Sequence, residues 1–331
     1  MFKHIRFVQS QNQILYKSIL SPNIKNCYLR FGAKCLRGFL SVAIVICRYI
    51  QNLVELKRYK YELGIIVIAK NESEYIQEWC SFHKIVGVDK IILFDNESTD
   101  NMKECLQPYI DSGFVEYHYW EGRVQQLPVY NEGLRLAKSD FKYLAFIDCD
   151  EYLFCDNKTI SLKKMINNFF DSHKLAGGLF VNWKMFGSNG LISTPSGLCI
   201  ENFTKRAMPG RPGTRWGKTI LRTKCSDFYC HPHYPLYNLG YAGYDQFGTL
   251  VQGCKNEIKE YSEICLNHYF CKSKEQWIKR RSIGDVNGLS EKDNRTIEQF
   301  VEHDNNDVID LAACNYVNQV YEDIKNIRNL N

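Results

Sequence analysis

Short apolar runs alternate with helical patterns between Gly64 and Asp148, and this alternation constrains the fold more than any other feature of the sequence. The apolar runs span 64–69, 90–95, 114–120 and 143–148. The helical patterns, with apolar residues three and four positions apart, span 75–86, 101–110 and 127–137. Continuous apolar strands indicate a sheet covered on both faces, and the repeated strand–helix order favours right-handed βαβ units. The sequence therefore predicts an α/β fold with a mostly parallel sheet and helices on both faces.

Polar residues follow three of these runs at the point where each strand is expected to end. They occupy 70–72, 95–100 and 148–151. Ligands of such sheets bind at the carboxyl ends of the strands. One polar ending could be ordinary helix capping or a turn, but three endings on one edge predict a binding site.

The fourth run leads into three carboxylates within four positions, Asp148, Asp150 and Glu151. Like charges this close repel and raise one another's pKa, so they either face solvent or surround a positive charge. Two carboxylates in an Asp-x-Asp pattern can hold a hard divalent cation, which would neutralise the repulsion. We expect Mn²⁺ or Mg²⁺ at Asp148 and Asp150, with a solvated turn as the alternative.

The composition sets limits on the class of protein. A chain of 331 residues with 45% hydrophobic residues can form one large domain or two with an ample core. None of the 14 cysteines forms a Cys-x-x-Cys pair, so structural zinc is not expected. Reduced thiols are typical of a cytosolic protein of this size, and we expect a cytoplasmic location, with the inner membrane face as one place within it.

Positive charge is concentrated at the amino-terminal end. Residues 1–60 hold eleven Lys and Arg and the single acid Glu55, a net charge of +10, so residues 61–331 sum to −5 in a chain of +5. A basic arm indicates an anionic partner. Its apolar stretch before Arg48 is nine residues long, short of the roughly 20 that span a bilayer. The arm is either a peripheral helix on anionic lipid or an amphipathic helix packed on the body. Without a recognisable basic–aromatic module, nucleic acid is not an expected partner.

Three stretches, "IIVIAKNESEYIQEW", "DNESTD" and "YNEGLRLAKSDFKYLAFIDCDEYL", resemble the nucleotide-sugar domain of GT-A glycosyltransferases. The resemblance is to family 2 and, more closely, to family 92, and it covers about 63–275. It implies a nucleotide-sugar half over 63–155 and an acceptor half over 156–275. The basic helical arm, 1–62, precedes this GT-A domain, and a carboxyl-terminal helical extension, 276–331, follows it.

The resemblance also implies a donor site. The residues that would bind the UDP-sugar are Lys70, Asn71, Glu72, Asp95, Asn96, Gln126, Asn131, Asp148 and Lys218. The metal ligands would be Asp148, Asp150 and His268, with a satisfied core histidine as the alternative for His268. Lys218, with Arg211 and Arg215 on a Gly/Pro-rich loop, would stabilise the departing diphosphate, unless that loop is merely a solvated basic segment.

On the acceptor side, "NWKMFGSNG" is similar to the acceptor loop of family 92. It implies that Trp183 stacks on a sugar ring and that Ser188 and Asn189 donate to hydroxyl groups. His231 and His233 are weaker candidates for the role of His268, as a metal ligand or a diphosphate contact. An inverting transfer needs a general base, for which Glu201 is the first candidate, with Asp245 and Asp285 as others. The alternative for Glu201 is an ion pair with Arg206 or Lys205.

The sequence as a whole predicts a metal-dependent, inverting glycosyltransferase that moves a sugar from a UDP-sugar to a glycan or lipid-linked acceptor. A catalytically inactive nucleotide- or carbohydrate-binding protein on the same fold is the alternative, although both Asp148 and Asp150 are present. A phosphatase with Asp-x-Asp on its first strand fits less well. Here the motif follows the fourth run, and Tyr152 stands where such phosphatases have Thr or Val.

Overall fold

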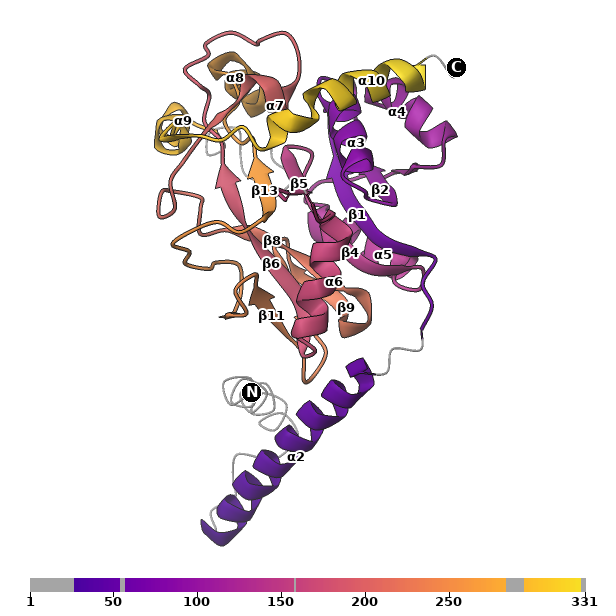
Figure 1. The fold of residues 1–331 in the computed structure, drawn as a ribbon, viewed down its shortest axis with the longest axis vertical. Coiled ribbons are helices and arrows are strands. Elements are labelled where there is room, and N and C mark those ends of the chain that lie inside the picture. The colour runs from indigo at the N-terminus through magenta and orange to yellow at the C-terminus, as the bar shows by residue number, and fades with distance from the viewer. Residues whose placement is uncertain (1–26, 54–56, 158, 284–294, 329–331) are drawn as a thin grey trace.

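The computed structural model describes residues 27–53, 57–157, 159–283 and 295–328. One large sheet forms the centre of the molecule, with strands in the order β12-β11-β6-β8-β4-β1-β2-β3 and with β13 and β5 joined to it through β6 (Figure 1). Helices cover both faces of this sheet. The predicted α/β fold, with a mixed, mostly parallel sheet and helices on both faces, is confirmed.

The four predicted strands form the parallel part of the sheet. They are β1 (Tyr61–Ala69), β2 (Lys90–Asp95), β3 (Val115–Tyr119) and β4 (Phe141–Phe146). The helices between them are α3 (Ile76–Ile85), α4 (Met102–Asp111) and α5 (Gln126–Ala137). Each element lies within three residues of its predicted bounds, because apolar periodicity and the polar strand ends both mark it in the sequence.

The second half of the chain extends the sheet, and one of its strands, β8, runs in the opposite direction to its two neighbours. Strand β8 (Gly217–Arg222) is antiparallel to both β4 and β6 (Ala176–Met185). Consequently β6 runs parallel to β4, and its carboxyl end reaches the edge where Asp148 lies. Strand β13 (Ile264–His268) pairs in parallel with β6 and antiparallel with β5 (Glu151–Cys155). This pairing places His268 opposite Glu151.

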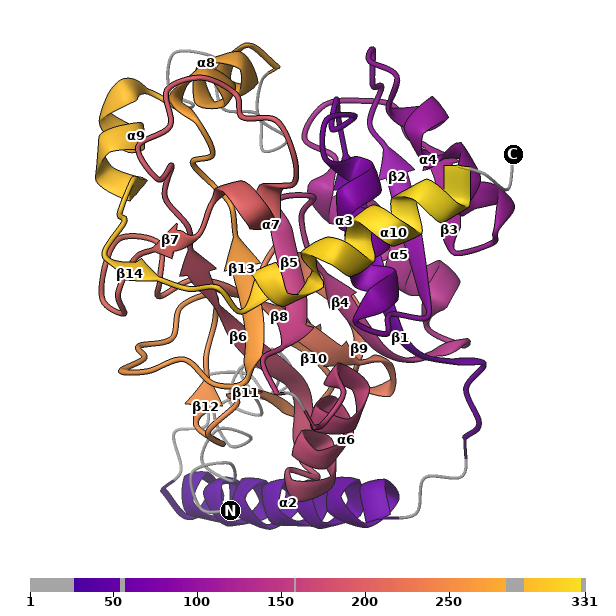
Figure 2. The ribbon, with the colours of Figure 1, turned by 45° about the horizontal axis from the view of Figure 1, so that its top comes forward.

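Smaller elements complete the described chain. They are α6 (Leu162–Ser172), α7 (Cys199–Asn202), β7 (Lys205–Arg206), η1 (Thr223–Cys225), β9 (Ser226–His231), β10 (Tyr234–Tyr237), β11 (Ala242–Asp245), β12 (Leu250–Val251), α8 (Lys274–Ile283), α9 (Ile297–His303), β14 (Val308–Ile309), η2 (Ala313–Tyr316) and α10 (Val317–Arg328). Strand β14 pairs with β7, and α10 packs on α3. The segment after residue 275 therefore packs on both halves of the predicted GT-A domain (Figure 2).

An apolar core packs on each of the two faces of the sheet. Trp79 and Phe82 of α3 belong to the core on one face, while Tyr130 and Leu134 of α5 belong to the core on the other. Helix α5 lies very close to β1, since a Cβ at Gly133 would stand 2.5 Å from the Ile66 side chain. Burial on both faces explains why the four strands read as unbroken apolar runs.

The basic arm contains one long helix, α2 (Cys27–Leu53). It contacts the body through Arg48, whose Nε donates to the Leu239 carbonyl at 3.1 Å, and through Asn52, whose amide donates to the Lys174 carbonyl at 2.7 Å. Among the residues that the structure describes, no helix has the length and apolar character needed to cross a membrane. Residues 1–26 of the predicted arm lie outside the described part of the chain.

Candidate active site at the carboxyl edge of the sheet

The first two predicted strand ends are tied together by hydrogen bonds. The Asn71 side-chain oxygen accepts from the Thr99 amide at 2.7 Å, and the Ser98 hydroxyl accepts from the Asn71 amide at 2.9 Å. Asp95 accepts from the Ser98 amide at 2.9 Å and from the Tyr117 hydroxyl at 2.6 Å. These contacts fix two loops side by side, as expected for neighbouring parallel strands.

The third strand end meets a buried lysine from the antiparallel strand. Asp148 accepts from Lys218 Nζ at 2.9 Å, from Gln126 at 3.0 Å and from the Tyr130 hydroxyl at 3.1 Å. Asp148 keeps 31% of its side chain exposed, whereas Lys218 keeps 2%. Burial lowers the pKa of Lys218, but Asp148 and Glu151 outweigh it and hold that pKa well above its usual value. Lys218 is therefore a fixed positive charge at this edge.

Glu151 lies fully buried beneath the same loop. One of its carboxylate oxygens accepts from the Asp148 amide at 3.1 Å, and the other is 3.8 Å from Lys218 Nζ. Burial raises the pKa of Glu151 well above its usual range, although Lys218 opposes that shift. Glu151 therefore holds the loop that carries Asp148 in place, and it is not exposed to a ligand.

Asp150 has its own set of positive partners. Its carboxylate is 3.5 Å from His268 Nε2 and 3.8 Å from Arg295. Arg280, which forms an ion pair with Glu72, lies close enough to act on the same carboxylate. Burial alone would raise the pKa of Asp150, but His268, Arg280 and Arg295 hold it well below its usual range. The repulsion expected among the three carboxylates is thus removed by cations of the protein itself.

A cavity of about 270 Å³ opens beside Asp150. Its wall includes the first strand end and the segment after β13, with Asn71, Glu72, Asp150, Lys272, Arg280 and Arg295 among the residues that line it. The cavity therefore combines carboxylates with cations. Such a mixture suits a ligand that carries both hydroxyl and phosphate groups.

The side chains around Asp150 offer only part of the set of ligands that a divalent cation needs. A carboxylate and an imidazole stand together at Asp150 and His268, and His268 Nδ1 is buried with no hydrogen-bond partner among the described residues. Asp148, however, faces Lys218. Within the described residues, no three His, Cys, Asp or Glu side chains are gathered as a metal site. Two of the three predicted ligands are thus brought together.

An aromatic cluster lies beside His268, the partner of Asp150. The Trp183 ring, at the carboxyl end of β6, is 4.3 Å from the His268 ring and 5.1 Å from the His233 ring, centroid to centroid. His233 also contacts Trp216 and lies 2.6 Å, through Nδ1, from the Gly217 carbonyl. Burial and Lys218 lower the pKa of His233 to about 3. His233 is therefore neutral, and its Nδ1–H donates to Gly217.

Three of the predicted site residues form hydrogen bonds with other parts of the protein. Asn131 Nδ2 donates to the Tyr229 carbonyl, and Asn131 Oδ1 accepts from the Tyr229 amide. Ser188 donates to Asp304 at 2.9 Å, and Asn189 donates to the Asn202 carbonyl at 3.0 Å. These three side chains fix loops, so the structure does not bring them to the strand-end cluster as free ligand contacts.

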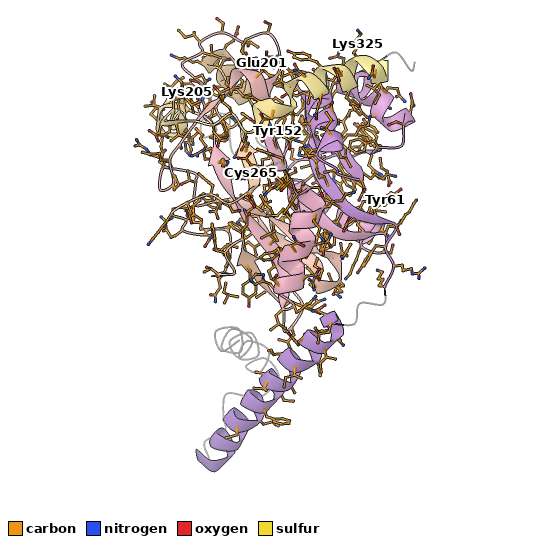
Figure 3. The ribbon with its side chains drawn as sticks, in the orientation of Figure 1. Tyr61, Tyr152, Glu201, Lys205, Cys265 and Lys325 are labelled. Atoms are coloured by element: carbon orange, nitrogen blue, oxygen red, sulfur yellow. The ribbon has the colours of Figure 1, made fainter. Side chains whose placement is uncertain are left out.

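The base candidates are likewise separated from the cluster by their contacts. Glu201 lies on α7 beside α10, where it accepts from the Tyr321 hydroxyl at 2.8 Å (Figure 3). The ion pair considered for it is absent from the described residues, since Arg206 pairs with Asp310. Asp245 accepts from the Thr249 amide at 2.7 Å and from Asn256 at 3.1 Å. The third candidate, Asp285, lies outside the described residues.

The remaining predicted residues divide between the edge and the surface. Lys70 follows β1 directly, and the Asn96 amide donates to the Trp120 carbonyl at 3.1 Å. Arg211 pairs with Asp307, and Arg215 pairs with Glu257, both as exposed or half-exposed ion pairs. The basic loop therefore carries paired, surface arginines in this structure.

Three residues at this edge of the sheet were not predicted from the sequence. Tyr130 contributes its hydroxyl to Asp148, while Arg280 and Arg295 come from the carboxyl-terminal helical extension, where neither was among the predicted site residues. The basic pair in "QWIKRR" was visible, but nothing in its spacing indicates which sheet edge it faces.

The sequence matches a known protein family over most of its length. The family model described as glycosyltransferase family 92 matches residues 66–304. A family 92 protein of Ricinus communis is 28% identical over 179 residues, which are 51% of this chain and 30% of that protein. One from Arabidopsis thaliana is 26% identical over 172 residues, 49% of this chain and 29% of that protein. The chain thus covers less than a third of these relatives.

Solved structures show partial likeness. S. aureus TarS in complex with UDP has 21% sequence identity and a TM-score of 0.33, and the match covers 50% of this chain and 47% of that one. Glucosyl-3-phosphoglycerate synthase from Mycobacterium tuberculosis, in complex with Mn²⁺, UDP and phosphoglyceric acid, has 17% identity and a TM-score of 0.25, covering 37% and 43%. The family model, by contrast, spans most of the chain and includes Lys70, Asp148, Lys218 and Arg295. This chain belongs to glycosyltransferase family 92.

Proposed function

We propose that this protein transfers a sugar from a UDP-sugar to a hydroxyl group of a glycan or lipid-linked acceptor, with metal dependence and with inversion at the anomeric carbon. One observation carries the proposal. Asp148, fixed by Lys218, and Asp150, beside His268, stand at the edge where the ends of β1 and β2 are tied together. Membership of family 92 and this geometry point to the same chemistry.

The donor would lie along the tied strand ends. Asn71, Asp95 and Asn96 offer carboxylate and amide groups for the uracil and ribose, with Lys70 and Glu72 beside them. Gln126 and Lys218 orient Asp148 for the same purpose, since both donate to its carboxylate. Fixed polar groups of this kind bind a ligand without first paying for reorganisation.

For the cation, Asp150 and His268 are the proposed ligands, with Asp148 as the third. Bound there, Mn²⁺ or Mg²⁺ would neutralise the charge of the diphosphate. The protein supplies further positive charge for the departing diphosphate from Lys218, Arg280 and Arg295. Because Lys218 and Arg295 are largely buried and already in place, they would act more strongly than solvated cations.

The acceptor would lie on the aromatic cluster. Trp183 presents a ring beside His268, close to the carboxylate that holds the donor. Neither Glu201 nor Asp245 is proposed as the base here, because Glu201 is held beside α10 and the carboxylate of Asp245 is held by Thr249 and Asn256. Ser188 and Asn189 are held by the protein and are not proposed as acceptor contacts.

Replacing Trp183 with Leu is expected to raise the KM for the acceptor about fivefold, because one stacking contact contributes about 1 kcal/mol. The affinity for UDP should stay within twofold, since Trp183 lies on the acceptor side of Asp150. Steady-state kinetics with varied acceptor, together with UDP titration, measure both. A variant that loses UDP binding and keeps its acceptor KM would place Trp183 in the donor site instead.

UDP with Mn²⁺ is expected to raise the melting temperature by several degrees, and EDTA should remove most of that shift. Ligand at 100 times its Kd stabilises the folded state by about 2.7 kcal/mol. A thermal-shift series with UDP, ADP and GDP, each with Mn²⁺, Mg²⁺ or EDTA, makes the measurement. Binding without any transfer from a panel of UDP-sugars would favour the inactive binding protein, and no binding of any nucleotide would contradict the donor site itself.

A further inference from the structure

Helix α2 presents two different faces. On one, Ser41, Val45 and Asn52 are buried, with 0%, 1% and 4% of their surface exposed. Arg48 lies on this face too, bound to the Leu239 carbonyl and placed over the Tyr241 ring. At 100° per residue these four positions fall within one narrow arc of the helix. This inner face is the one that holds α2 to the body.

The opposite face is apolar and exposed. Its residues are Leu36, Phe39, Leu40, Val42, Ile46, Cys47, Tyr49, Ile50 and Leu53. The large apolar side chains among them are 38–71% exposed. The positions recur three and four apart, so they form one continuous stripe along the helix. No Lys, Arg, Asp or Glu interrupts this stripe, which we call the outer face of α2.

We propose that the outer face of α2 docks into the interfacial region of an anionic bilayer, with the helix lying in the plane of the membrane. A stripe of this size on a water-soluble surface marks an interaction site. Basic residues flank it, since Lys57, Arg58 and Lys60 are exposed just beyond the helix and residues 1–60 carry a net charge of +10. An apolar face beside concentrated positive charge is the arrangement that anionic lipid binds.

Charge also argues against a second copy of the chain as the partner of the outer face of α2. Two such arms packed face to face would bring +10 against +10, and like charges at an interface oppose association. An anionic lipid surface reverses that sign. The in-plane orientation follows from the inner face, because the contacts of Arg48 with Leu239 and of Asn52 with Lys174 hold the helix along the protein.

This placement fixes where the strand-end site stands relative to the bilayer. Strand β6 begins two residues after Lys174, which contacts Asn52 of α2, and reaches Trp183 at the site. Seven residue steps of a strand span about 23 Å. Figures 1 and 2 both show α2 at the opposite end of the sheet from α7 and α8. A membrane-anchored acceptor for the proposed transfer would therefore have to project about that far, as a glycan chain does and a single headgroup sugar does not.

Vesicle co-sedimentation tests the proposal. We expect the full chain to bind vesicles of phosphatidylcholine with 30% phosphatidylglycerol, and to bind pure phosphatidylcholine at least tenfold more weakly. The triple variant Phe39→Ser, Ile46→Ser, Ile50→Ser should lose at least tenfold in affinity for the anionic vesicles. The matched control is Ile192→Ser, Val301→Ser, Leu311→Ser, which removes equally exposed apolar residues from the body and should change nothing.

A fluorescent label reports on depth independently of folding. An environment-sensitive dye on Cys47, with Cys27, Cys35 and Cys230 replaced by Ser, should shift to the blue on anionic vesicles. The same dye on Cys230, also exposed but on the body, should not shift when Cys27, Cys35 and Cys47 are Ser. Absence of wild-type vesicle binding overturns the proposal. If light scattering then shows a dimer that the outer-face variant dissolves, the face joins two copies; a monomer leaves α2 without a membrane role. Neither outcome touches the donor site, which UDP binding tests separately.

Discussion

Replacing Lys218 with Met is expected to lower the free energy of unfolding by roughly 3–5 kcal/mol, the cost of breaking a buried ion pair on one side. Lys218 is 2% exposed, and its Nζ is 2.9 Å from Asp148 and 3.8 Å from Glu151. Asp148 can hydrate, since 31% of its side chain is exposed. Glu151 cannot, because it is fully buried. Most of the loss therefore comes from the carboxyl group of Glu151.

The loss should depend on pH in a definite direction. The pKa of Glu151 is already raised in the folded protein, and removing Lys218 raises it further. A raised folded-state pKa stabilises below the pKa of the unfolded chain, about 4.3 for Glu, and that stability is lost as pH rises. The deficit of the variant should therefore be small near pH 4 and should grow through neutral pH. Urea unfolding from pH 4 to 8 measures it.

Two further variants test the cause. Adding Glu151→Gln to Lys218→Met should recover part of the stability and remove most of its pH dependence. Replacing Arg135, which pairs with Glu132 on the surface, with Met should cost less than about 1 kcal/mol. A Lys218→Met deficit that stays the same at every pH would show that Glu151 does not sense Lys218.

Replacing Asp150 with Asn is expected to lower sugar transfer about 10²- to 10³-fold, the size of effect seen when one preorganised polar group is removed from an active site. The change is nearly isosteric, but it removes the charge that faces His268, Arg280 and Arg295. The Mn²⁺ dependence of UDP binding should be lost with it, because Asp150 is a proposed ligand of the cation. Turnover measurements and UDP titrations with Mn²⁺ or EDTA test the two effects.

The control is Asp227→Asn, an exposed carboxylate paired with Lys138, which should leave both quantities unchanged. Unfolding of both variants separates lost activity from lost structure. If the Asp150 variant stays folded and still binds UDP in a Mn²⁺-dependent way, Asp150 does not hold the cation. If it transfers sugar normally as well, the reacting groups lie elsewhere than at this edge.

The sheet and its helices could be predicted because their cause is local. Strands buried on both faces must be apolar throughout, and α3 and α5 must repeat every three to four residues to meet them. The polar strand ends were visible for the same reason, since Asp95 and Asp148 directly follow such runs. The order of the strands in the sheet was not visible, because the antiparallel entry of β8 between β4 and β6 is a matter of packing alone.

The sequence by itself determined which residues could carry the chemistry, namely the carboxylates that end the strands and the basic, apolar arm before them. Only the tertiary structure decided their partners. Lys218 reaches Asp148 from 70 residues away, and Arg295 reaches Asp150 from still farther along the chain. Asn189 and Glu201, which resembled acceptor and base residues, proved to be held by loops and by α10. A charge is visible in a sequence, but the charge that neutralises it is chosen by the fold, because electrostatic contacts depend on distance in space and not on distance along the chain.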